Sequence, residues 1–239
     1  MKSIKEIFIV GNGPSSSHTI GPSKALDYIL NKYQNIDKIE IILYGSLSLT
    51  GKGHLIDVVI DNKLKNINHD IKFDYFTKSN HTNTMDFLIY KNNTLFKERI
   101  YSIGGGTIKV KGAKSNKIVE IYKENTLKEI LFYCKEHNKT LLEYVLEKEK
   151  DILIYLKNIL KIMDEATYRG INNTGELPGS LHVIKKANTI YNAAIKNNNE
   201  GLKNNALVMA YAFAVSEENA SGGVVATAPT CGSCGVIPG

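Results

Sequence analysis

Hydroxyl and imidazole side chains are concentrated in the sequence GPSSSHTIGP near the start of the chain, where Ser15, Ser16, Ser17, His18 and Thr19 follow one another. Flanking Gly and Pro residues favour a loop. Such a loop can wrap a small anion, a carboxylate or a phosphate, especially when it precedes the N-terminus of a helix. The alternative is a solvent-exposed loop that only caps the helix, and the residues alone leave both interpretations open.

Two further histidines stand in polar segments. His54 ends the GKGH segment of YGSLSLTGKGHLID, and His81 precedes Asn83 in NHTNTMDF. An imidazole titrates near neutral pH, so each ring could act as a general acid or base. A structural role for His54 is the alternative. The GKGH order is not that of a phosphate-binding P-loop.

The three cysteines suggest metal or redox chemistry at one place only. Cys231 and Cys234 form a C-x-x-C in APTCGSCGVIPG, whereas Cys134 has apolar neighbours and is expected in a helix core. A close thiol pair can bind zinc, bind an iron–sulfur cluster or act in redox chemistry, but a metal site needs three or four ligands. A thioredoxin-like or zinc protein is disfavoured because no βαβ pattern or further close ligand surrounds the pair.

Composition excludes several classes of protein. The 239 residues carry a formal charge of +6 and are 43% hydrophobic, so a core can be buried. The basic residues are scattered among acids and Asn, which argues against nucleic-acid binding. We expect no signal peptide and no membrane span, because no apolar run approaches about 20 residues. The odd, sparse cysteines favour a reducing compartment, and we expect a cytoplasmic protein.

The first half of the chain reads as mixed strand and helix. A short strand or entry segment is expected at 5–10, a helix at 22–33 on 3.6-residue periodicity, and a strand at 38–47. Residues 54–61 and 70–76 are further strand candidates, and 85–106 predict a hairpin that turns at Asn92 and Asn93.

From Thr126 onward the pattern is helical. TLKE and TLLE each fit a capping box, apolar residues recur at three and four up to Ile162, and further helices are expected at 178–195 and 201–220. We therefore predict an α+β N-terminal domain, a mixed sheet with helices, over residues 1–120. The start of an all-helical domain follows over 121–239, with the boundary near 115–125.

Seven collinear segments resemble the bacterial iron–sulfur L-serine dehydratases. They are GPSSSHTIGP, YGSLSLTGKGH, HTNTM, YSIGGG, RGINNTGELPG, VSEENASGG and TAPTCGSCGVIP. The resemblance implies a lyase, an L-serine ammonia-lyase that forms pyruvate and ammonia without pyridoxal phosphate. It also implies a [4Fe–4S] cluster on three cysteines acting as Lewis acid, a homodimer in the full-length form, and a place in amino-acid catabolism and gluconeogenesis.

The resemblance also assigns roles to residues of this chain. His54 and His81 match the pair that handles protons, and the Ser15–Thr19 loop with His18 matches the part that surrounds the substrate, together with Asn83. Cys234 matches the first cluster cysteine. Cys231 stands where many members have Asn, so it is not expected to be a ligand.

Departures from the family pattern bear on activity. The stretch between His54 and His81 is shorter than is typical, and Val224 stands where many members have a basic residue. The family's other two cluster cysteines lie beyond the segment that ends at Gly239, so we expect a fragment, a disrupted gene product or one half of a split enzyme. The rival hypothesis is a small-ligand-binding or dimerisation module that keeps the substrate loop and has no chemistry.

Overall fold

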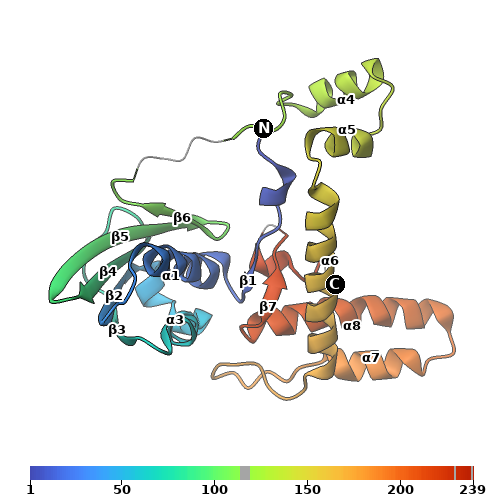
Figure 1. The fold of residues 1–239 in the computed structure, drawn as a ribbon. Coiled ribbons are helices and arrows are strands. Elements are labelled where there is room, and N and C mark those ends of the chain that lie inside the picture. Colours follow the sequence, from blue (N-terminus) through green and yellow to red (C-terminus); the bar gives the residue numbers. More distant parts are fainter. Residues whose placement is uncertain (114–118, 229, 238) are drawn as a thin grey trace.

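The computed structural model describes residues 1–113, 119–228, 230–237 and 239. A sheet region, residues 13–113, lies beside a helical region that comprises the described residues from 119 onward (Figure 1). The expected class, a mixed sheet with helices followed by a helical portion, is confirmed. The expected boundary near 115–125 falls partly on residues outside the described part, and the division into two domains stays a prediction.

The sheet region holds a five-stranded sheet of order β3-β2-β4-β5-β6. Its strands are β2 (Lys38–Gly45), β3 (Asn68–Asp74), β4 (Asn83–Lys91), β5 (Thr94–Gly104) and β6 (Thr107–Val110). Only the β2–β3 pair is parallel. The predicted hairpin turn is confirmed, because Asn92 and Asn93 both take positive φ, 47° and 59°, as a two-residue primed turn requires.

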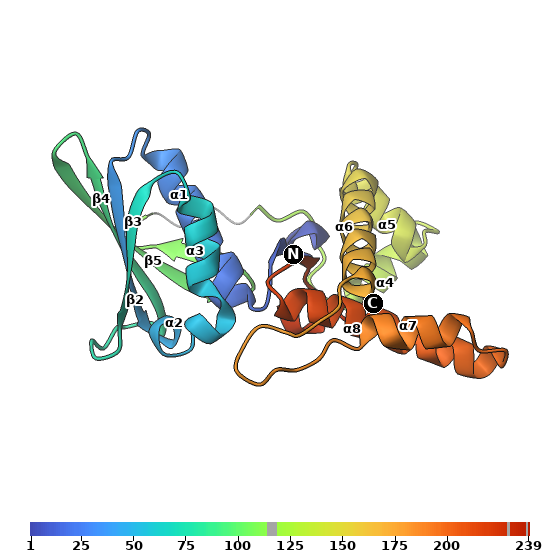
Figure 2. The same ribbon diagram turned by 90° about the horizontal axis from the view of Figure 1, so that it is seen from below.

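One face of the sheet carries the main core. The helices α1 (Gly21–Lys32) and α3 (Ile56–Leu64) pack on this face (Figure 2). Alternate strand residues meet them, because side chains of a strand point to opposite faces in turn. The fully buried members include Leu26, Ile41 and Phe87. The other face is polar, with Arg99 bonded through two nitrogens to Asp86, so a two-layer arrangement results.

The strand expected at 54–61 is wrong: residues 56–64 form the helix α3. The run of β-branched residues favours a strand locally. However, Ile56, Ile60 and Leu64 recur at a spacing of four and are buried together, which is the spacing of one helix face. Parallel strands need a long crossover connection, usually helical, and α3 supplies it between β2 and β3.

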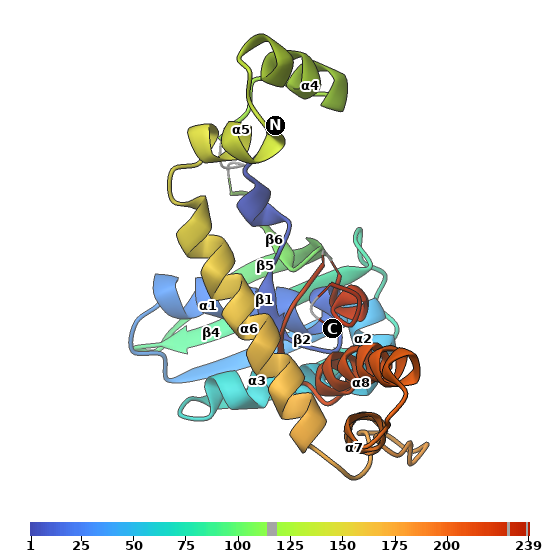
Figure 3. The same ribbon diagram turned by 90° about the vertical axis from the view of Figure 1, so that its right-hand side faces the viewer.

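The helical region contains α4 (Leu127–Glu136), α5 (Leu141–Lys148), α6 (Ile152–Asn172), α7 (Ala187–Ile195) and α8 (Glu200–Ala220). Both predicted capping boxes are confirmed. Thr126 pairs with Glu129 at the start of α4, and Thr140 pairs with Glu143 at the start of α5. Cys134 is buried, as expected. In Figure 3, α6 crosses the α7–α8 pair.

The helix expected at 178–195 begins only at Ala187. The preceding residues form an irregular arm, closed by backbone hydrogen bonds from Leu177 to Val183 and from Lys185 to Gly175. Two features explain the late start. Gly179 takes φ 118°, outside the helical range, and the carboxylate of Glu217 accepts the backbone N–H of Ala187 and so caps α7 from α8.

The N-terminal segment belongs with the helical region. The strand or entry segment expected at 5–10 is an entry segment with a 3₁₀ turn, η1 (Ile4–Glu6), and it reaches the strand β1 (Val10–Asn12) only at Val10. The Tyr155 hydroxyl of α6 donates to the carbonyls of Lys5 and Phe8. β1 pairs antiparallel with β7 (Val224–Ala226). The chain therefore enters the sheet region from the helical region.

Within the described residues, no helix combines the length and the apolar character needed to cross a membrane.

Candidate functional site

The Ser15–Thr19 segment forms a tight turn rather than an open loop. Residues Ser16–Ile20 make one π-helical turn, η2, that leads directly into α1. The Ser15 hydroxyl accepts the N–H of His18 as an N-terminal cap. Thr19 is fully buried and donates its hydroxyl to the carbonyls of Asn12 and Ser15. The Ser16 carbonyl accepts the N–H of Gly21, the first residue of α1.

His18 is held by hydroxyls on both ring nitrogens. Its Nε2 lies 3.1 Å from Thr50 Oγ1 and 3.1 Å from Ser46 Oγ. Thr50 donates its own hydroxyl hydrogen to the Ser46 carbonyl at 2.9 Å, so Thr50 can only accept from Nε2–H. The neutral ring therefore accepts at Nδ1, where the Ser17 hydroxyl lies at 2.8 Å. These contacts fix the ring and its tautomer.

His18 and His54 stack on each other. Their ring centroids are 4.5 Å apart and the planes differ by 25°. Burial, and then the neighbouring His54 ring, lower the pKa of His18 below 6.5, against a smaller raising effect of the Ser46 contact. His18 is therefore neutral at pH 7. We call the group Ser15, Ser17, His18, Ser46, Thr50 and His54 the cradle.

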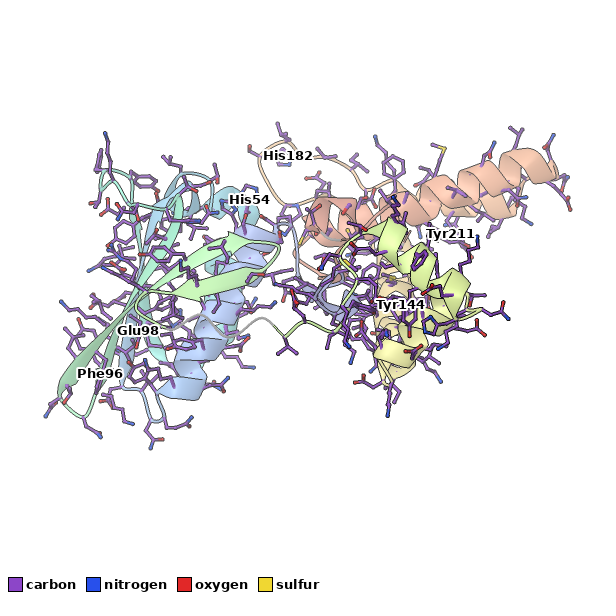
Figure 4. The ribbon with its side chains drawn as sticks, turned by 90° about the horizontal axis from the view of Figure 1, so that it is seen from above. His54, Phe96, Glu98, Tyr144, His182 and Tyr211 are labelled. Atoms are coloured by element: carbon purple, nitrogen blue, oxygen red, sulfur yellow. The ribbon has the colours of Figure 1, made fainter. Side chains whose placement is uncertain are left out.

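His54 projects from a 3₁₀ turn, η3 (Lys52–His54), that lies between α2 (Ser46–Leu49) and α3. It therefore precedes a helix and not the strand expected at 54–61. The Thr50 carbonyl, which can only accept, is 2.8 Å from His54 Nδ1. The neutral ring thus carries its hydrogen on Nδ1 and leaves the Nε2 lone pair available as a base. His54 lies on the side of the sheet region that faces the helical region (Figure 4).

A close backbone approach connects the cradle to His81. At the end of β2, Gly45 takes φ 60°, and a Cβ there would lie 2.4 Å from the Thr82 carbonyl oxygen. The next residue, Ser46, donates its N–H to the same oxygen at 2.7 Å. Only glycine fits this position, so the loop that carries His81 and the helix that carries Ser46 are joined at one point.

His81 carries the opposite tautomer from His54. The backbone N–H of Asn83 donates to His81 Nδ1 at 3.1 Å, so in the neutral ring the hydrogen is on Nε2 and can be donated. Asn83 begins β4, and its buried Oδ1 has no hydrogen-bond partner among the described residues. A free acceptor next to a hydrogen-bond donor is suited to a bound polar molecule.

The two neighbouring thiols lie in the helical region, in a turn that we call the thiol turn. Cys231 begins the short 3₁₀ turn η4 (Cys231–Ser233), and Cys234 follows it. Both are buried, and Cys234 packs with Ala166, Val215 and Val225. Burial raises the pKa of Cys231 to about 12, with a smaller contribution from Cys234, and burial raises the pKa of Cys234 to about 11.

Neutral thiols of this kind become metal ligands only if a bound cation favours their thiolate forms. Among the described residues no three His, Cys, Asp or Glu side chains are grouped to hold a metal ion. Cys231 and Cys234 have the right donor chemistry for iron or zinc but do not complete a site.

The strand pair β1–β7 connects the cradle and the thiol turn. β1 leads into the cradle and β7 leads into the thiol turn. Because the strands are antiparallel and three residues long, the C-terminal ends of β1 and β7 lie about 7 Å apart along the strand axis.

The structure brings together the Ser15–Thr19 turn and His54, and it joins the His81–Asn83 loop to them through Gly45. Cys234 comes from the helical region. Sequence reasoning missed Ser46 and Thr50, which complete the shell of hydroxyls around His18. The hydroxyl-rich YGSLSLTGKGH segment that contains them was the available signal.

Family models match most of the chain. A model of the serine dehydratase alpha chain matches residues 57–239, and a model of the serine dehydratase beta chain matches residues 3–65.

Individual relatives extend this match. The chain is 33% identical over 297 residues to an L-serine dehydratase of Haemophilus influenzae, with 100% of the chain and 65% of that protein covered. It is 32% identical to an L-serine dehydratase of Helicobacter pylori, at 99% and 64% coverage, and 31% identical to L-serine dehydratase 1 of Escherichia coli, at 100% and 65%. The chain thus spans 64–65% of the length of these relatives.

Proposed function

Because this chain belongs to the serine dehydratase family, we propose that the protein is a lyase that converts L-serine to pyruvate and ammonia. The named relatives are L-serine dehydratases, which supports serine as substrate. Serine breakdown of this kind belongs to amino-acid catabolism, and its pyruvate can feed gluconeogenesis.

The observation that carries the proposal is the pair of opposite tautomers at His54 and His81. Loss of water from serine requires a base for the α-proton and a proton for the departing hydroxide. In the proposed reaction His54 Nε2 takes the α-proton, His81 Nε2–H donates a hydrogen bond to the hydroxyl as the Cβ–O bond breaks, and the proton on His54 passes to the departing hydroxide. The products are water and aminoacrylate, which tautomerises and hydrolyses to pyruvate and ammonia.

The cradle and its surroundings are proposed to bind the substrate. Ser15, Ser16, Ser17 and Thr19 supply hydroxyls or backbone groups, and the neutral His18 places no positive charge beside His54. Asn83 Oδ1, buried and without a partner among the described residues, is proposed to accept from the substrate's ammonium group. Burial of an unmatched acceptor is unfavourable, so a bound ammonium would relieve that cost.

We propose Cys234 as one ligand of a [4Fe–4S] cluster, which when bound would supply Lewis-acid chemistry. The buried Cys234 sulfur has the donor chemistry for such a group once it is deprotonated, but the described residues do not complete the ligand set. No step of the reaction is therefore assigned through the cluster. Cys231 is treated as a neighbouring thiol without a ligand role.

The test is pyruvate formation from L-serine by the protein made from its native gene, reconstituted anaerobically with iron and sulfide. His54→Gln should lower the rate at least about 100-fold, the usual size of a lost general base. His69→Gln is the matched control, because His69 lies on the outer strand β3 and bonds to Asp61. Full activity of His54→Gln would refute the assignment.

Location and assembly are further parts of the proposal. Three free cysteines support a reducing compartment such as the cytoplasm. The family resemblance supports a homodimer of the full-length form, which light scattering would test. A monomer at micromolar concentration would contradict it.

A second candidate is a serine-binding module without turnover. It is favoured by the placement of the whole cradle within residues 15–54, apart from both thiols. Calorimetry with L-serine on protein without iron would then show binding that His18→Ala weakens and Cys234→Ala leaves intact, and reconstituted protein would form no pyruvate.

A further inference from the structure

Two segments singled out in the sequence, RGINNTGELPG and VSEENASGG, contribute no side chain to the cradle, yet they meet each other through an ion pair. Arg169 lies near the end of α6 and Glu218 near the end of α8. Arg169 Nε donates to Glu218 Oε1 at 2.5 Å, and Arg169 Nη2 donates to the Val224 carbonyl at 2.6 Å. The Glu218 side chain is only 8% exposed and that of Arg169 is 40% exposed, so the carboxylate is shielded from solvent and the guanidinium covers it from the outside.

The ion pair encloses the turn between α8 and β7. Glu218 lies before this turn and Val224 after it, and Arg169 holds both. The Gly223 N–H also donates to the Glu218 carbonyl at 2.9 Å. A Cβ on Gly223 would lie 2.3 Å from the Glu218 carboxylate, so the turn and the ion pair are packed in direct contact. The position of the turn therefore depends on where Arg169 holds the carboxylate.

The same turn holds the approach to the cradle. The Gly13 N–H donates to the Gly223 carbonyl and Asn12 Nδ2 donates to the Gly222 carbonyl, both at 2.9 Å. A Cβ on Gly13 would lie 2.2 Å from the Asn219 carbonyl oxygen, so the end of α8 lies directly against this backbone. Two residues later the chain reaches Ser15, the cap of the η2 turn.

Hydrogen bonds of Asn12 and Thr19 connect this backbone to the cradle. The Asn12 carbonyl accepts the hydroxyl of Thr19 at 2.6 Å, and the Thr19 N–H donates to the Ser15 carbonyl at 2.9 Å. Ser15 and Ser17 flank the ring of His18. A continuous series of hydrogen bonds thus runs from Arg169 to His18 through backbone groups with little freedom.

We propose that Arg169 and Glu218 form a positioning unit for the substrate cradle: the ion pair fixes the 221–223 turn, and the turn fixes the start of the Ser15–Thr19 segment. This inference rests on the proposed function insofar as the cradle binds L-serine. The pair lies in the helical region and the cradle in the sheet region, so its effect is to keep the two in one arrangement. A displacement of about 1 Å in such a site can lower turnover about 100-fold.

The test uses the full chain with Arg169→Met, which keeps much of the side chain's volume and removes the ion pair. Arg169→Lys is the conservative variant, since it keeps the charge but cannot hold Glu218 and Val224 together through a planar fork. Lys161→Met on the same helix is the matched control, because the ion pair of Lys161 among the described residues is a long and exposed one, with Glu165 at 3.8 Å. The readouts are amide hydrogen exchange and the KM and kcat for L-serine after reconstitution.

For Arg169→Met we expect faster exchange at the amides of Thr19 and Ile20, unchanged exchange in β2 and β4, and a serine KM raised about tenfold or more. Arg169→Lys should restore part of both effects, and Lys161→Met should match the wild type. Unchanged exchange at Thr19 and Ile20, or an equal acceleration throughout the sheet, would overturn the inference. If the wild type forms no pyruvate while the local exchange still changes, the proposed function fails and the positioning role stands.

Discussion

The sheet region and the helical region bury their apolar side chains very differently. One continuous core between the sheet and its two helices joins fourteen buried residues. The helical region has only clusters of three or four buried residues. It also exposes large apolar side chains such as Phe132, 62% exposed, and Ile154, 69% exposed. Burial of apolar surface is the main stabilising contribution to folding, so the two regions should differ in stability although both have well-formed local structure.

The largest expected effect comes from separating the two regions. Residues 13–113 alone should unfold in one cooperative thermal transition, because they contain the whole of the main core. Residues 120–239 alone should show helical circular dichroism without a sharp transition, because their apolar faces lack partners. A cooperative melt of 120–239 would contradict the comparison.

Matched phenylalanine truncations sharpen the comparison. Phe87→Ala in β4 removes a side chain that is 1% exposed and should lower the free energy of unfolding by about 4 kcal/mol. Phe132→Ala in α4, where the ring is 62% exposed, should change it by less than about 0.5 kcal/mol. Urea titration measures both. A large loss for Phe132→Ala would mean that this helix face has a partner.

Gly45→Ala tests the joint between the cradle and the His81 loop. Positive φ and the contact with the Thr82 carbonyl should together cost about 3 kcal/mol, the upper part of the range for a strained backbone position. The rate of serine turnover should fall by more than the loss of folded protein accounts for, because the loop that carries His81 separates from the cradle that contains His54. Gly53→Ala is the control, since a Cβ there meets nothing within 4 Å. Equal behaviour of the two variants would argue against the joint.

A buried carboxylate connects the N-terminal segment to the helical region. Glu149 accepts from the Ser3 and Tyr122 hydroxyls and from the Ile4 N–H. Burial raises the pKa of Glu149, but these three hydrogen bonds outweigh burial and hold the pKa below its usual 4.5. A lowered folded-state pKa adds stability above the unfolded-state value, and this stability is lost as pH falls through the folded-state value.

Glu149→Gln should therefore cost about 2 kcal/mol at pH 7, because the amide leaves a hydroxyl partner unmatched. The difference from the wild type should shrink as the pH is lowered below about 4. Urea titrations at pH 7 and at low pH measure it. A difference that stays constant with pH would show that the charge of Glu149 is not what matters.

Small but measurable losses of stability are expected at the helix caps. Thr126→Ala and Thr140→Ala each remove one half of a capping box and should cost about 1 kcal/mol. Lys128→Ala, on the exposed face of α4, is a suitable control. Costs near zero at both caps would indicate that α4 and α5 are frayed already in the wild type.

Local signals in the sequence were sufficient where one segment determines its own structure. The two capping boxes and the Asn92–Asn93 turn are of this kind, since the residues that form each feature are neighbours in the chain. The error at α3 has the opposite origin. Val58, Val59 and Ile60 favour a strand locally, and only the need to connect the parallel β2 and β3 makes this segment a helix.

The candidate site shows the same difference between features set by neighbouring residues and features set by tertiary contacts. The chemistry of Ser15–Thr19, His54 and His81 was visible as residue types in polar loops. The stacking of His18 on His54 joins residues 36 positions apart, and the roles of Thr50 and Gly45 depend on tertiary contacts. The tautomers of His54 and His81 depend on which backbone group meets each ring, and no pattern of residue types contains that information.

The pairing of β1 with β7 has a consequence for the order in which the protein assembles. The partners of residues 10–12 are residues 224–226, which are synthesised more than two hundred residues later. Contacts that close so long a segment form slowly. The strand that leads into the cradle must therefore wait, unpaired, until β7 has been synthesised, so the sheet core can be complete before the Ser15–Thr19 turn is anchored.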